Sequence, residues 1–259
     1  MNDRYDTLRV EARPGHDWVT LDRPDTLNAM NQSMIAELLD YFTSLSMESP
    51  ARVIVLTGAG RAFCSGLDLK AFAEDPALRS VEAGMHTQRK LSGLILAMRR
   101  CPQPIVCLLN GVASGGGLAL ALASDIRVAT PKARMNAAFI KVGLSGCDVG
   151  VSYLLPKLVG ASIAAEMMLT GRFIEADNAE RIGLVSSVVA DADLSAVGEG
   201  MVAEMLQASS LGLALTKQAI DLNLAAPSLE AAVALEDRQQ VICIATGELA
   251  RRQAAFVDR

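Results

Sequence analysis

Aromatic residues, histidines and closely spaced cysteines are scarce in this sequence of 259 residues. Only 4% of the chain is aromatic although 51% is hydrophobic, so its core must be aliphatic and rich in alanine. The five cysteines show neither CxxC spacing nor the pattern of a disulfide framework, which is typical of a reduced protein. Because His16 and His86 are the only histidines, we expect no zinc or other metal site.

The chain also lacks a basic excess and a long uninterrupted apolar run. Its formal net charge of −5 argues against a nucleic-acid partner. The first fifteen residues are charged and lack the apolar stretch of a secretory signal. Residues 101–124 carry no charge, but Pro102, Pro104 and the Gly115–Gly117 run interrupt them, so we expect no membrane span. These features predict a cytoplasmic protein without nucleic-acid or membrane partners.

The order of apolar runs and helical periods predicts an α/β architecture. Residues 7–12 and 17–21 alternate around Pro14-Gly15, as in a hairpin. Further strands are expected at 52–57, 105–109 and 125–129, and helices at 31–46 (with Asn31 as N-cap), 83–100 and 116–122. This alternation favours a mostly parallel sheet. The last part reads as helices at 193–207, 212–223, 228–244 and 247–256. We therefore expect a core over residues 1–190 and a helical segment, 191–259, that packs on the core or on another subunit.

Two glycine-rich turns, each preceded by an apolar strand, are the most informative motifs that are present. They are RVIVLTGAGRAFCSGLDL at 52–69 and IVCLLNGVASGGGLAL at 105–120. Such turns leave backbone N–H groups free and let a ligand approach closely. Two of them converging on one point form an oxyanion hole, which favours an enzyme. A dinucleotide-binding turn is not expected, because Phe63 stands where its third glycine is required.

The first turn enters a predicted helix near Leu69. The N–H of Leu67 would belong to the unpaired first turn of that helix and is free to donate to an anionic oxygen. We interpret Asp68, at the start of the helix, as a partner of the helix dipole. Cys64 has no histidine near it in sequence and is interpreted as a small buried thiol rather than a nucleophile.

Four stretches, in this order and at this spacing, resemble the crotonase (enoyl-CoA hydratase/isomerase) superfamily. They are LDRPDTLNAM at 21–30, GRAFCSGLDL at 60–69, NGVASGGG at 110–117 with SDIRVA at 124–129, and LPKLVG at 155–160. The resemblance covers nearly the whole chain. It implies a spiral of ββα units, an acyl-CoA thioester as substrate, and homotrimers or dimers of trimers. It implies no separate cofactor, because coenzyme A is part of the substrate.

The resemblance also implies roles for individual residues. The thioester carbonyl would bind to the backbone N–H groups of Leu67 and Gly116, which would stabilise an enolate-like oxyanion. The adenine and pantetheine parts of coenzyme A would lie along residues 23–27 and 62–69. The implied substrate contacts are Arg23, Leu27, Ala62, Ser65, Gly66, Asp68, Leu69, Ala119 and Phe139.

The chain departs from the hydratases at both positions where the resemblance places a catalytic glutamate. Ala119 and Phe139 stand there, and neither side chain transfers a proton. The replacement candidate is Asp148, between Gly146 and Gly150. It either transfers a proton in double-bond isomerisation or atypical hydration, acts as the nucleophile of a dehalogenase-like reaction, or only caps the following helix.

A catalytically silent acyl-CoA-binding relative is the further alternative. The dehalogenase-like reaction also needs a histidine base, for which His86 is the one candidate. We interpret His86 instead as a partly exposed helix residue.

Overall fold

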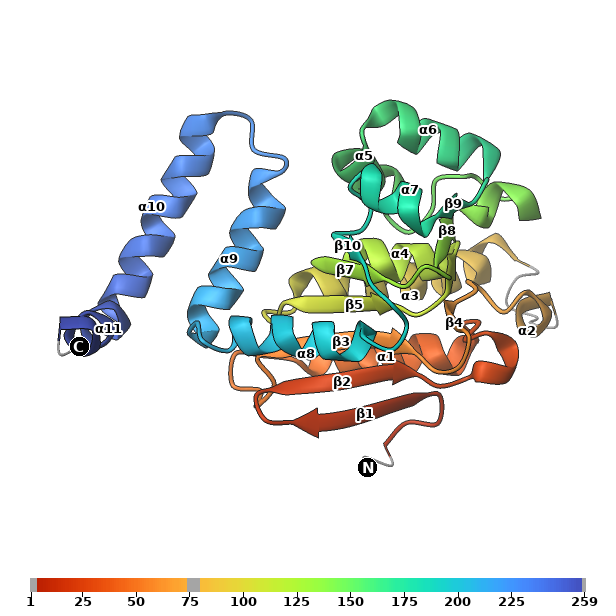
Figure 1. Cartoon of the computed structure of the whole chain (residues 1–259). Helices are drawn as coiled ribbons and strands as arrows, with labels where there is room; N and C mark the ends of the chain where they lie inside the picture. The colour runs from red at the N-terminus through yellow and green to blue at the C-terminus, as the bar shows by residue number, and fades with distance from the viewer. Residues whose placement is uncertain (1–3, 74–79, 258–259) are drawn as a thin grey trace.

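Two β-sheets of unequal size order the chain in the computed structural model, which describes residues 4–73 and 80–257 (Figure 1). The larger sheet has the strand order β1-β2-β3-β5-β7-β10. Its strands are β1 (Leu8–Arg13), β2 (His16–Leu21), β3 (Val53–Gly58), β5 (Ile105–Leu109), β7 (Ile126–Ala129) and β10 (Ser187–Val188). Only the β1–β2 pair is antiparallel, and its two-residue turn contains Gly15 at φ +79°. The predicted hairpin and the mostly parallel sheet are confirmed.

The smaller sheet continues the units of the larger one. It consists of β4 (Ala62–Cys64), β6 (Val112–Ser114), β8 (Arg134–Asn136) and β9 (Ile174–Glu175), in that order. Strands β3, β5 and β7 are each followed by one of these short strands and then by a helix, so the chain advances as a spiral of ββα units. Because β4 and β6 pair in parallel, the two glycine-rich turns lie next to each other.

Helices cover both faces of the larger sheet. They are α1 (Gln32–Ser44), α2 (Leu69–Ala73), α3 (Val81–Arg100), α4 (Gly116–Ala123), α5 (Val151–Val159), α6 (Ala161–Thr170), α7 (Ala176–Arg181), α8 (Leu194–Met205), α9 (Ser210–Asn223), α10 (Leu229–Ala245) and α11 (Glu248–Val257). Two short 3-10 helices, η1 (Pro24–Thr26) and η3 (Ala138–Val142), lie beside the glycine-rich turns and before α5.

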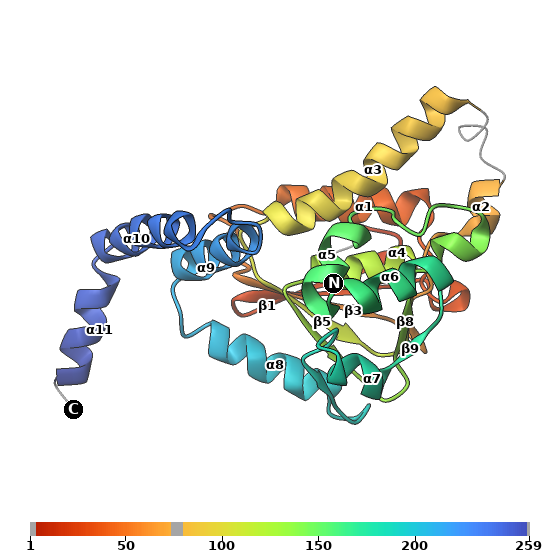
Figure 2. The same ribbon diagram turned by 90° about the horizontal axis from the view of Figure 1, so that it is seen from above.

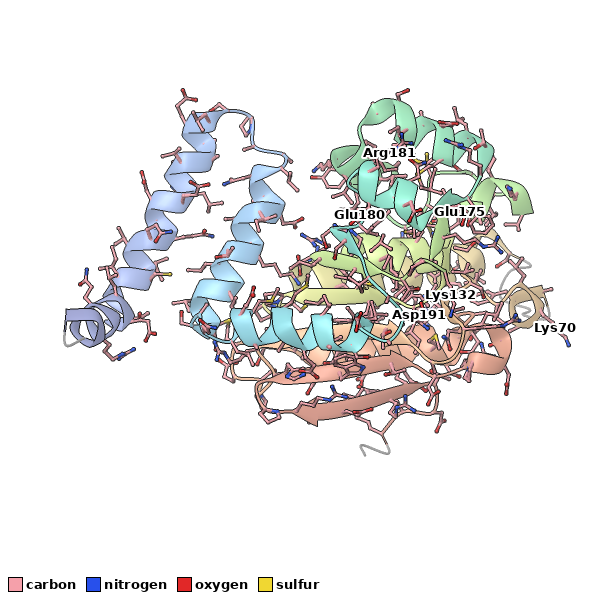
Figure 3. All side chains as sticks on the ribbon, viewed as in Figure 1. Lys70, Lys132, Glu175, Glu180, Arg181 and Asp191 are labelled. Carbon is pink, nitrogen blue, oxygen red and sulfur yellow. The ribbon has the colours of Figure 1, made fainter. Side chains whose placement is uncertain are left out.

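The period-two pattern of β3 explains how both faces of the sheet are buried. Ile54 and Leu56 join the core formed with α1, α3 and α4, whereas Val53 and Val55 face Leu194 and the rest of α8. Helix α8 therefore packs on the core, which is one of the two placements expected for the C-terminal segment. An ion pair between Lys132 and Asp191 joins the β7–β8 turn to the segment before α8 (Figure 3).

Helices α9 and α10 form a hairpin that projects beside the sheets. Helix α11 follows the C-terminal end of α10, away from the loop that joins α9 to α10 (Figures 1 and 2). Within the described part of the chain, no helix has the length and apolar character needed to cross a membrane. The predicted helices are all present, with ends that differ by at most two residues from the expected ones. Asn31 caps α1, because its side chain accepts a hydrogen bond from Met34 N at 2.9 Å. The short strands of the smaller sheet were not predicted.

Candidate active site

The two glycine-rich turns approach each other so closely that side chains are excluded between them. A Cβ added to Gly66, which has φ +100°, would lie 2.8 Å from the carbonyl oxygen of Ser114 and 3.6 Å from the nitrogen of Gly116. A Cβ added to Gly117 would lie 2.1 Å from the carbonyl oxygen of Cys64. The convergence expected from the two sequence motifs is therefore present, and it depends on glycine.

The backbone around Leu67 leaves its N–H group available. Leu67 forms an isolated parallel bridge to Met30, in which Met30 N donates to Gly66 O at 2.7 Å and Asp68 N donates to Met30 O at 3.0 Å. Both bonds come from the neighbours of Leu67, so its own N–H points to the other side of the extended segment and has no acceptor among the described residues. Gly116 is the first residue of α4, where an N–H has no intrahelical acceptor.

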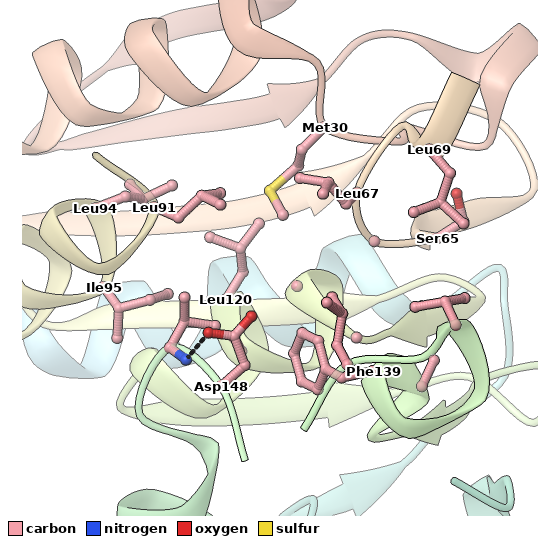
Figure 4. A pocket seen from close by; sticks show the side chains of 18 of the residues that line it. Met30, Ser65, Leu67, Leu69, Leu91, Leu94, Ile95, Leu120, Phe139 and Asp148 are labelled. Carbon is pink, nitrogen blue, oxygen red and sulfur yellow. Dashed lines mark hydrogen bonds between the residues drawn. The ribbon is translucent and has the colours of Figure 1, made fainter. Parts of the chain in front are cut away.

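A pocket opens beside these two N–H groups (Figure 4). Its walls come from the two turns, α3, α4, η3 and the segment before α5. The lining residues are Met30, Ser65, Gly66, Leu67, Leu69, Gln88, Leu91, Leu94, Ile95, Gly115, Gly116, Ala119, Leu120, Ala138, Phe139, Val142, Leu144, Asp148 and Val149. Most are apolar, and among these described residues Asp148 alone is ionisable. The pocket is therefore suited to an apolar substrate that meets one carboxylate.

Asp148 is half-buried at this pocket and does not cap α5. Its Oδ1 accepts hydrogen bonds from Val149 N at 2.8 Å and from Nε2 of Gln88 on α3. The N-cap of α5 is Gly150, without a side-chain hydrogen bond, and Val151 N bonds instead to the backbone oxygen of Asp148. The interpretation of Asp148 as a helix cap is wrong, because its carboxylate is turned towards α3.

Ala119 and Phe139, the two residues at the expected glutamate positions, both line the pocket. Ala119 lies in the fully buried helix α4. The Phe139 ring lies beside Gly115, where an added Cβ would be 3.7 Å from the ring. Neither brings a polar group. Gln88 was missed in the sequence, because helical periodicity places it on one face of α3 but does not say which loop that face meets.

Ser65, Gly66 and Leu69 also line the pocket, whereas Arg23, Leu27, Ala62 and Asp68 are not among the residues that line it. Ser65 N donates to the carbonyl oxygen of Leu27 at 3.0 Å. The Asn28 side chain donates to the carbonyl oxygen of Ala62 at 2.8 Å.

Asp68 starts α2 by accepting from Ala71 N at 3.1 Å, which confirms its position at the helix N-terminus. Arg23 forms an ion pair with Asp68 at 3.0 Å. Burial alone raises the pKa of Asp68, but the hydrogen bonds from Ala71 and Arg23 outweigh it and hold the pKa below its ordinary value.

Two other sequence interpretations are confirmed. Cys64 is completely buried, and this burial raises the pKa of its thiol to about 12, which is incompatible with a nucleophilic thiolate. His86 is exposed on α3, beside Glu82 and Arg89, and does not line the pocket. The dehalogenase-like alternative therefore lacks its histidine base in the described pocket.

Comparison with known proteins identifies the family of the chain. The family model described as "Enoyl-CoA hydratase/isomerase" matches residues 16–259. The chain belongs to this family. Enzymes of the enoyl-CoA hydratase/isomerase family act on acyl-CoA substrates, and the crotonase fold expected from the sequence is the fold observed here.

Individual members of the enoyl-CoA hydratase/isomerase family resemble the chain over most of its length. The Mycobacterium bovis protein named "Probable enoyl-CoA hydratase echA12" is 42% identical over 90% of this chain and 83% of its own. The 1,2-epoxyphenylacetyl-CoA isomerase of Escherichia coli K12 is 36% identical over 78% of this chain and 77% of its own. The solved enoyl-CoA hydratase from Mycobacterium smegmatis has a TM-score of 0.90 and 30% identity, covering 98% of this chain and 96% of the other.

Proposed function

We propose that this member of the family isomerises a carbon–carbon double bond in an acyl-CoA thioester, with Asp148 as its only proton-transfer group. The observation that carries the proposal is the single carboxylate, which faces a mostly apolar pocket beside the N–H groups of Leu67 and Gly116. The acyl chain would contact Ala119 and Phe139, and the thioester carbonyl would accept from the two N–H groups.

The reaction needs one base and one oxyanion site. The Asp148 carboxylate removes a proton from Cα of a 3-enoyl thioester, and the electron pair moves into the carbonyl to give an enolate oxyanion. The N–H groups of Leu67 and Gly116 stabilise that charge. As the carbonyl re-forms, the Cα–Cβ double bond forms, the Cβ–Cγ double bond takes up the proton at Cγ from Asp148, and the carboxylate is regenerated. No water or second acid is consumed.

Isomerisation fits the pocket better than hydration for a chemical reason. Adding water requires one group to activate the water and another to protonate Cα. Ala119 and Phe139 supply neither group, so a hydration would have to be atypical and use Asp148 for both steps. We also propose that the adenine and pantetheine parts of coenzyme A lie along residues 23–27 and 62–69, because Ser65 and Leu69 already form one wall of the pocket.

The test of the proposal is Asp148→Asn, assayed with a panel of 2-enoyl-, 3-enoyl-, dienoyl- and aryl-CoA thioesters. We expect turnover of an enoyl thioester by the wild type and a loss of about 10²–10⁴-fold in kcat in the variant, because an amide cannot accept the proton. Asp177→Asn, which changes an exposed aspartate of α7, is the matched control and keeps full activity.

Three results would contradict the proposal. Unchanged turnover in Asp148→Asn removes Asp148 from the chemistry, and binding of acyl-CoA without any turnover by the wild type favours a silent relative. Incorporation of ¹⁸O from labelled water into Asp148 during turnover identifies nucleophilic catalysis instead.

We further propose that the chain forms trimers or dimers of trimers. Helix α10 buries one described residue, Gln239, and exposes apolar side chains on the projecting hairpin, including Leu229 and Val241 at 76% and 65% exposure. A projecting apolar surface of this kind is typical of a subunit contact.

A further inference from the structure

The two oxygens of the Asp148 carboxylate have different surroundings. Oδ1 accepts both the Val149 N–H, at 2.8 Å, and the amide of Gln88. Oδ2 accepts no hydrogen bond from any residue in the part of the chain that is described. Since a carboxylate only accepts hydrogen bonds, the Gln88 group that faces it is the NH₂. One oxygen is thus held and the other is left for a substrate proton.

The donor on one side of this contact belongs to a rigid element. Gln88, Leu91 and Ile95 recur at positions i, i+3 and i+7 of α3, so they form one stripe, and all three line the pocket. Within this stripe Gln88 is the polar member. Its amide is half-buried among apolar side chains, where a polar group without a partner is unfavourable. The contact with Asp148 meets that requirement.

The acceptor, in contrast, lies on a segment without regular structure. Asp148 is in the connection 143–150 between η3 and α5, and Val149 has φ +38°, which is unfavourable for a β-branched residue. Neither a helix nor a strand fixes the direction of the Asp148 side chain. The bond from α3 is the contact that ties this carboxylate to another element of the fold.

We infer that Gln88 is a positioning residue for the proposed reaction, holding the Asp148 carboxylate so that Oδ2 faces the acyl chain. The inference rests on the function proposed above. A neutral amide is suited to this task, because it stabilises the ionised carboxylate without placing a positive charge beside the base. Loss of the amide therefore has two consequences: the carboxylate loses its orientation, and its ionised form loses a hydrogen bond.

The charged and titratable groups around Asp148 are few. No other described residue that lines the pocket is ionisable. The preceding Cys147 is exposed and turns its Sγ towards Met168 Sδ, at 3.7 Å. On α3, His86 and Lys90 are exposed and do not line the pocket. A change at Gln88 therefore acts on a single carboxylate of the pocket.

The experiment compares Gln88→Met and Gln88→Glu with the wild type, using the enoyl-CoA thioester that the wild type turns over. Met keeps the length of the side chain without the amide, and we expect a loss of about tenfold or more in kcat with KM nearly unchanged. Glu places a second carboxylate against Asp148 and should lower kcat at least as far, because the two like charges repel each other.

Lys90→Met, on the same helix, is the matched control and keeps the wild-type kcat and KM. The inference is overturned if Gln88→Met has the wild-type kcat, if its loss lies in KM rather than in kcat, or if Lys90→Met behaves in the same way. Asp148→Asn, assayed in parallel, separates a failure of the positioning role from a failure of the proposed function. If that variant is inactive while Gln88→Met is unchanged, the proposed function stands and the positioning role fails. If Asp148→Asn is fully active, the proposed function itself fails.

Discussion

Gly116 and Gly117 are neighbours in the chain, yet an added methyl group would meet different atoms at the two positions. At Gly117 it would lie 2.1 Å from the carbonyl oxygen of Cys64, which belongs to the backbone of the other turn. At Gly116 it would lie 2.3 Å from the terminal methyl group of Met30. A backbone oxygen in a parallel strand pair cannot move aside, whereas the end of a methionine side chain changes rotamer easily.

Gly117→Ala should therefore lower the free energy of unfolding by about 2–4 kcal/mol, because the two turns must separate. Gly116→Ala should change it by less than about 1 kcal/mol, since displacement of Met30 is offset by the better helix propensity of alanine. Urea unfolding of the two variants checks this difference. Equal stability of both variants would mean that the turns are not held together as tightly as the geometry requires.

The composition of the site could be predicted only in part from single residues. The turns, Leu67 and Gly116 were recognisable because strand, glycines and helix follow one another in a fixed order. Asp148 stood out as a charge between two glycines in a stretch with few charges. Its contact with Gln88 was not predictable, because residues sixty positions apart meet through the packing of a loop on α3, which no local pattern encodes.

At the scale of elements, long periodic segments were predictable and short strands were not. The strands β1, β2, β3, β5 and β7 are alternating or apolar runs, and α1, α3 and α11 have apolar residues at a helical period, so their existence follows from the sequence, whereas the two-residue strand β10 was not expected. The strands β4, β6 and β8 have three residues each, too few for an alternation to be recognised. They exist because neighbouring units place them side by side, which is a tertiary effect.

Helix α9 is attached to the core by a buried cation. Nζ of Lys217 donates to the carbonyl oxygens of Met98 and Gln103 at 2.9 and 2.8 Å and lies 3.3 Å from Asp125. Its side chain is 3% exposed. A second ion pair, Arg99–Asp221, joins α9 to α3 at 2.9 Å, but the Asp221 side chain is 35% exposed and screened by solvent. The buried contact therefore dominates the attachment.

We expect Lys217→Met to lower the free energy of unfolding by about 3 kcal/mol, because two carbonyl groups lose a buried donor and Asp125, which keeps its ion pair with Arg99, loses its second cation. Asp221→Asn, on the same helix, should cost less than about 1 kcal/mol. Urea unfolding measures both values, and limited proteolysis of the 206–209 link detects release of α9. If Lys217→Met is as stable and as resistant as the wild type, another contact fixes this helix.

At the scale of the whole molecule, the projecting α9–α10 hairpin is the feature that a single subunit does not explain (Figure 1). Val241 and Ile244 of α10 are 65% and 54% exposed, and an apolar helix face in water is unfavourable unless another surface covers it. Three subunits around an axis would cover it.

Sedimentation equilibrium of the wild type should give three or six subunits, and the double variant Val241→Glu/Ile244→Glu should dissociate, because charges cannot be buried unpaired at the contact. Met47→Glu, at an exposed apolar residue after α1, is the matched control and keeps the wild-type mass. A monomeric wild type, or a double variant with unchanged mass, would contradict assembly through α10.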